Sequence, residues 1–76
     1  MNKNRRQALQ GIIDQLTELK EAVESLQEEE QEAFDNLPES FQYSERGEAM
    51  EEAISNLEDA VNSIDEAISS IESATE

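Results

Sequence analysis

The clearest pattern in the chain is a seven-residue repeat of apolar and polar positions near its end. The repeat reads AISNLED from Ala53, AVNSIDE from Ala60 and AISSIES from Ala67. When the heptad is lettered a to g, rows a and d hold large apolar side chains and row g holds alanine. The a row is Ile54, Val61 and Ile68, the d row is Met50, Leu57, Ile64 and Ile71, and the g row is Ala53, Ala60, Ala67 and Ala74. Such rows are typical of a helix that packs against other helices.

The first half of the chain carries a second helical pattern, with large apolar residues in alternating steps of three and four. They are Leu9, Ile12, Leu16, Leu19, Val23 and Leu26, and the stripe is widened by Ile13 and Ala22. This spacing predicts an amphipathic helix over residues 4–34. Glu30 follows Val23 in the same row, within three adjacent glutamates, so the seam is expected to weaken towards this end.

Residues 35–44 predict the connection between the two helices. Pro38 ends the first helix because proline lacks the backbone donor, and it can also open one short turn. Ser44 is expected to cap a second helix over residues 45–74. The chain is therefore predicted to be one all-α domain over residues 1–76, folded as an antiparallel, coiled-coil-like two-helix hairpin.

A single hairpin cannot bury three apolar rows on both helices, because two helices share only one seam. The chain is also near the lower size limit for a stable core, and it has no cysteine or histidine for disulfides or common zinc sites. We therefore expect a homodimer that forms a four-helix bundle. The predicted oligomer core is Leu16, Leu19, Val23, Leu57, Val61, Ile64 and Ile68.

Charge narrows the range of partners. The chain has 20 acidic and 5 basic residues, a formal net charge of -15. Residues 1–20 hold four bases against two acids, and residues 21–76 hold eighteen acids against Arg46 alone. Such a surface repels nucleic acid and anionic membranes and favours a basic protein partner or high solubility. No apolar run reaches the roughly 20 residues of a membrane span, so we expect a soluble, intracellular protein.

The acids of the repeat are the first candidate partner-binding surface. Rows e and f hold Glu51, Glu52, Glu58, Asp59, Asp65, Glu66 and Glu72. A solvated helix face is the simpler interpretation. However, solvated helices commonly pair glutamate with lysine, whereas this helix has no lysine and fills rows b and c with serine and asparagine. The composition favours a surface selected for binding.

The connection is the second candidate, because all three aromatic residues lie in or beside it. One interpretation is structural: apolar side chains close the end of the bundle and Arg46 pairs with a nearby glutamate. The residues concerned are Phe34, Leu37 and Phe41 for the closure, and Glu39 or Glu48 for the pair. The other is functional: Phe41, Tyr43 and Arg46 form a recognition corner, as loop aromatics and arginines often do.

The stretch from Asp35 to Ile54 reads DNLPESFQYSERGEAMEEAI. With the basic start and the acidic heptads, it resembles small acidic helical-hairpin proteins encoded by bacteriophages and prophages. The specific part of the likeness is LPES at 37–40 and SERG at 44–47. The resemblance implies a phage setting, in which small acidic proteins often bind host or defence proteins, and it implies no particular activity. We therefore expect a cytoplasmic location in the bacterial host cell.

These patterns lead to three hypotheses. The first is an acidic module that inhibits or modulates a bacterial protein by occupying its basic, nucleic-acid-binding surface. The second is a structural adaptor whose heptads pair with another coiled coil, and the third is a sponge that holds a phosphate ligand between Tyr43 and Arg46 of two subunits. We expect no enzyme, cofactor or metal site. The acids lack a neighbouring His or Cys, and the EF-hand-like start at Asp35 has Ser40 at its sixth position and Arg46 at its twelfth.

Overall fold

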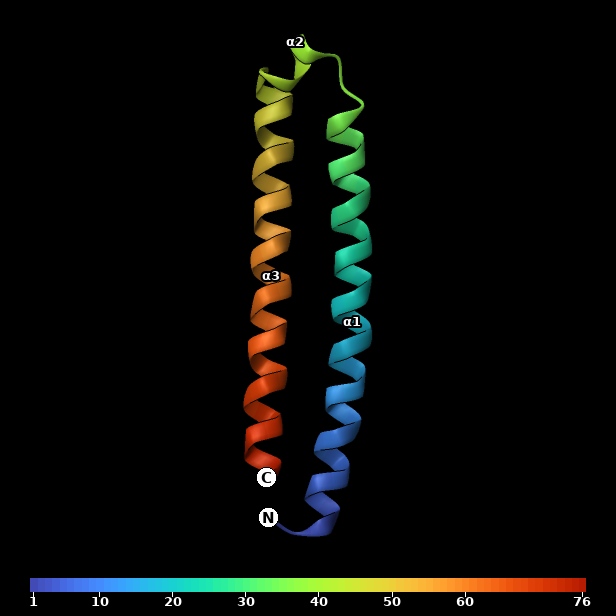
Figure 1. Cartoon of the computed structure of the whole chain (residues 1–76), viewed down its shortest axis with the longest axis vertical. Coiled ribbons are helices and arrows are strands. Elements are labelled where there is room, and N and C mark those ends of the chain that lie inside the picture. The colour runs from blue at the N-terminus through green and yellow to red at the C-terminus, as the bar shows by residue number, and fades with distance from the viewer.

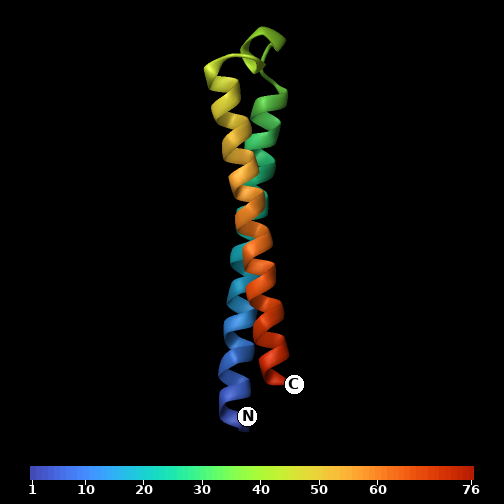
Figure 2. The same cartoon turned by 90° about the vertical axis from the view of Figure 1, so that its left-hand side faces the viewer.

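The computed structural model describes all 76 residues as two long antiparallel helices joined by a short one (Figure 1). Helix α1 spans Lys3–Asp35, α2 spans Glu39–Gln42 and α3 spans Glu45–Thr75. In Figure 1 α1 and α3 lie side by side, and in Figure 2 α3 lies in front of α1 along most of its length. Both views place the two termini at the end opposite α2. The molecule measures 58 × 15 × 12 Å, so it is a rod that is one helix pair thick. The predicted all-α helical hairpin is confirmed.

Side-chain caps mark the start of each long helix. The Asn2 side chain accepts a hydrogen bond from the Arg5 N–H at 2.8 Å, and the Ser44 hydroxyl accepts one from the Gly47 N–H at 3.3 Å. These bonds satisfy amides that have no partner inside the helix. Ser44 therefore caps α3 as its sequence position predicts.

The seam between the long helices is lined by apolar side chains from α3 and by both apolar and polar side chains from α1. Helix α3 contributes an unbroken apolar row of half-buried side chains: Met50, Ile54, Leu57, Val61, Ile64, Ile68 and Ile71. Helix α1 contributes Leu9, Ile13, Leu16, Lys20, Val23, Gln27, Glu30 and Phe34. Within this seam only Ile13 is fully buried, at 7 % exposure. One helix pair thus encloses almost no core.

The inward row of α1 differs from the one that its apolar pattern suggests. Steps of three and four from Leu9 would turn Ile12, Leu19 and Leu26 inward, but these side chains are 43 %, 58 % and 59 % exposed. The residue that follows each of them, Ile13, Lys20 or Gln27, faces α3 instead. This rotation brings Ile13 and Phe34 into the seam and lets the Lys20 ammonium reach a carboxylate on α3 while its aliphatic stem covers apolar surface.

The end of the hairpin that carries α2, here called the loop end, is fixed by a side-chain clasp. The Gln42 amide donates to the carbonyl oxygens of Phe34, at 3.3 Å, and Leu37, at 3.1 Å. These bonds tie α2 to the last turn of α1. On the other side Gly47 is buried, because the backbone of Phe41 and Gln42 passes where a side chain would project.

Neither long helix has an apolar stretch that is long enough to cross a membrane.

The two glycines provide a matched test of this packing. Gly47→Ala places a Cβ against the Gln42 carbonyl, so we expect a loss of about 1–3 kcal/mol in unfolding free energy from the forced backbone shift. Gly11→Ala meets no atom within 4 Å, so it should stabilise α1 by roughly 1 kcal/mol through helix propensity. Urea unfolding followed by circular dichroism measures both. Equal stabilisation by the two alanines would show that α2 does not pack on Gly47.

Candidate functional site

The seven acids of rows e and f lie along one side of α3 and form what is here called the acidic stripe. Its members are Glu51, Glu52, Glu58, Asp59, Asp65, Glu66 and Glu72, and all of them are exposed. The heptad repeat places successive members of one row about 10.5 Å apart along the helix. The stripe therefore presents carboxylates at regular intervals over most of the length of α3.

One cation crosses the seam to the acidic stripe. The Lys20 ammonium lies 2.9 Å from the Asp65 carboxylate and 4.0 Å from that of Glu24 on its own helix. The hydrogen bond and the charge of Asp65 raise the pKa of Lys20 above its ordinary value, and the charges of Glu24 and Glu21 add to this. Since Lys20 joins Asp65 to Glu24, row e of α3 lies on the same side of the hairpin as Glu24.

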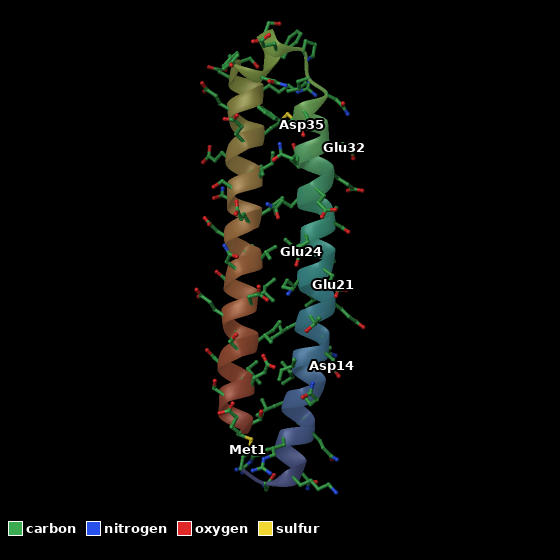
Figure 3. All side chains as sticks on the ribbon, viewed as in Figure 1. Met1, Asp14, Glu21, Glu24, Glu32 and Asp35 are labelled. Atoms are coloured by element: carbon green, nitrogen blue, oxygen red, sulfur yellow. The ribbon has the colours of Figure 1, made fainter.

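Helix α1 extends the negative charge on that side. Figure 3 shows acidic side chains following α1 from Asp14 through Glu21 and Glu24 to Glu32 and Asp35. Residues 21–64, the half of the hairpin at the loop end, hold fourteen acids against Arg46 alone, a net charge of -13. The remaining residues hold six acids against four bases, a net charge of -2. The negative potential is therefore concentrated at the loop end.

The predicted recognition corner is open to solvent. Phe41 is 54 % and Tyr43 is 79 % exposed, and Arg46 is also exposed. Both ion pairs of the molecule belong to Lys20, so the expected pairing of Arg46 with Glu39 or Glu48 is wrong. Phe34 and Leu37 are half-buried at the loop end, but Phe41 does not close it. The cap and the clasp at this end use the side chains of Ser44 and Gln42, and not those of Phe41, Tyr43 and Arg46.

Six of the seven residues predicted for the oligomer core lie half-buried in the seam of the single hairpin. They are Leu16, Val23, Leu57, Val61, Ile64 and Ile68. Leu19 is the exception, because it lies on the flank of α1 and is 58 % exposed. Leu19 is thus the member of this set that a single chain leaves most available to another molecule.

Two features of the site do not follow from the apolar pattern alone. Lys20 occupies an inward position because it lies seven residues after Ile13, and the sequence does not show that Ile13 faces inward in place of Ile12. Gln42 clasps two carbonyl groups, a role that no local motif reveals.

The surface has no pocket, and no three acidic, histidine or cysteine side chains are placed to hold a metal ion. No protein-family model, curated protein or solved structure matches this chain.

The Lys20 contact predicts an ordered set of pKa changes. In the wild type the Lys20 ammonium should titrate above the ordinary lysine range, and Asp65→Asn should lower its pKa more than Glu24→Gln does, since Asp65 is the larger cause. Because the folded-state pKa is raised, this contact stabilises the fold at neutral pH and is lost as the pH rises through that pKa. Carbon-detected NMR titration of the lysine side chains measures the shifts. A larger effect from Glu24→Gln would contradict the cross-seam contact.

Proposed function

We propose that this chain is a phage-type acidic binding module without enzymatic activity. It works as a homodimer and occupies a basic surface of a bacterial protein, one that otherwise binds nucleic acid. The observation that carries this proposal is the acidic stripe: seven exposed carboxylates stand in register on α3, and the one cation near them, Lys20, contacts only Asp65 among the seven.

The composition of α3 supports a binding role over simple solvation. Rows b and c, which flank row f around the helix, hold small polar residues, so no long cationic side chain of α3 shields the carboxylates there. Exposed carboxylates of one sign attract a basic partner over roughly a Debye length and speed its encounter. Nucleic-acid-binding proteins present such basic surfaces, because they must neutralise phosphates.

The recognition corner supplies the specific part of the proposed contact. Phe41, Tyr43 and Arg46 are exposed at the loop end, where the net charge is concentrated. Aromatic and arginine side chains are over-represented among residues that dominate binding energy. In this proposal the stripe provides long-range attraction and the corner provides short-range anchoring.

The structural adaptor is the second candidate, and the exposed row of Ile12, Leu19 and Leu26 favours it. An adaptor of that kind binds through apolar heptads, so its partner remains bound when the acidic stripe is neutralised. This difference separates the two functions in one experiment.

The test is capture from bacterial lysate with a pair of variants that change the net charge equally. The stripe variant carries Glu58→Gln, Asp59→Asn, Glu66→Gln and Glu72→Gln, and it spares Asp65, which holds Lys20. The control variant neutralises four exposed acids outside both the stripe and the α1 acids labelled in Figure 3, namely Glu18, Glu28, Glu29 and Glu76. We expect the wild type and the control to retain a basic partner at 0.1 M salt, and duplex DNA to displace it.

The stripe variant should bind that partner more weakly by about fourfold to several hundredfold, since each exposed ion pair contributes roughly 0.2–1 kcal/mol. Salt at about 1 M should release the partner, because it shortens the Debye length to about 3 Å. Undiminished binding of the stripe variant, or retention at 1 M salt, would reject the acidic-surface function and favour the adaptor.

A further inference from the structure

One flank of the hairpin is an uncovered apolar surface. The contact of Lys20 with Asp65 and Glu24 puts row e of α3 and the α1 row that contains Glu24 on one side of the seam. Row g of α3 and the α1 row of Ile12, Leu19 and Leu26 therefore lie on the other side. The surface defined by these rows, here called the apolar face, consists of Ile12, Leu19, Leu26, Ala53, Ala60, Ala67 and Ala74, all of them exposed. No charged residue interrupts either row between its first and last member.

The exposed area of the chain is large for its mass. A compact monomer of 8.6 kDa exposes about 4,700 Å², whereas the hairpin exposes 5640 Å². The surplus of about 900 Å² is close to the ~800 Å² that each partner buries in a standard protein interface. The chain as a whole therefore leaves exposed about as much extra surface as one partner buries in a stable interface, and its nearly absent core favours burial of that surface against another molecule.

The shape of the apolar face suits a second copy in reversed orientation. Helix α1 runs from Lys3 to Asp35, so Leu19 is its middle residue, and Ile12 and Leu26 lie seven residues to either side. When two copies of α1 cross antiparallel at Leu19, the whole length of each helix is paired. Ile12 of one copy then lies level with Leu26 of the other.

Charge selects this orientation over the parallel one. Parallel hairpins would bring together two loop-end halves, each with a net charge of -13. Antiparallel hairpins place each of these halves beside a half with a net charge of only -2. The reversed orientation also brings Lys3 level with Asp35 of the second copy and Arg6 level with Glu32, so cations of the N-terminal turns lie near acids.

We propose that a second copy of this chain covers the apolar face in antiparallel orientation, with the two-fold axis passing beside Leu19. This inference rests on the homodimer proposed above and assigns its interface. The two α1 helices pack through their large side chains, and the two α3 helices approach more closely because alanine fills their row. The acidic stripe remains outside the interface. One recognition corner lies at each end of the dimer, where Arg46 continues row g beyond Ala53.

The chain contains no cysteine, so single introduced thiols report the geometry. A disulfide forms only when two Cβ atoms come within about 3.5–4.5 Å. Leu19→Cys should form a disulfide-linked dimer in a glutathione redox buffer, with at least a tenfold higher yield than Glu66→Cys, which is exposed outside the apolar face. Ile12→Cys and Leu26→Cys should each link poorly alone and link to one another when the two proteins are mixed. All four positions are exposed in the hairpin, so the substitutions leave its seam intact.

Linking of Leu19→Cys to Ala67→Cys, without self-linking of Leu19→Cys, would overturn the proposal in favour of parallel hairpins. A dimer by sedimentation in which Leu19→Cys links no better than Glu66→Cys would overturn the interface while leaving the dimer intact. A folded monomer at about 100 µM would overturn both. The lysate capture described above measures binding of a basic partner independently of disulfide linking and sedimentation. A failure of the proposed function is therefore distinguishable from a failure of the proposed interface.

Discussion

Two helices share one seam, and this geometric limit governs the whole molecule. Helix α3 uses its large apolar residues on the seam and leaves a row of alanines beside it. Helix α1 divides its large apolar residues between the seam and the flank, so its inward row must accept Lys20, Gln27 and Glu30. The result is a hairpin with one buried core side chain, Ile13, and a continuous apolar face. Covering such a face with a partner stabilises the assembly by about 25 cal/mol for each Å² of apolar surface that is removed from water.

Electrostatics divides the surface of the hairpin into regions with different properties. Lys20 contacts Asp65 across the seam, and the remaining carboxylates of the acidic stripe have no cation within ion-pair distance. Like charges at this density destabilise a compact state. Of the two dimer orientations, the proposed antiparallel one has the weaker repulsion between chains, because it separates the two strongly negative halves. It also leaves the acidic stripe facing solvent, where the proposed partner would meet it. In the heptads of α3, rows a and d therefore form the seam, row g forms the proposed dimer interface, and rows e and f form the proposed binding surface.

The heptad pattern was sufficient to predict the hairpin, the cap at Ser44 and the surplus of apolar rows. Each depends on local spacing or on one residue's hydrogen-bonding capacity, which the sequence shows directly. The rotation of α1 was not predictable in this way, because Ile12 and Ile13 are both apolar and the choice between them depends on Lys20 reaching Asp65, 45 residues away. The Gln42 clasp and the burial of Gly47 likewise depend on where α2 folds back. For the candidate site, the sequence identified the acidic stripe and the exposed corner, but its expected partner for Arg46 was wrong because nothing in the fold brings a carboxylate within 4.0 Å of it.

The central claim is that separate faces carry association and binding, and sedimentation equilibrium on three proteins tests it most directly. The wild type and the stripe variant should both sediment with twice the 8.6 kDa mass of one chain, while Leu19→Asp, which places a charge at the centre of the apolar face, should lose the dimer. A folded wild-type monomer, or a Leu19→Asp protein that remains as dimeric as the wild type, would contradict the account.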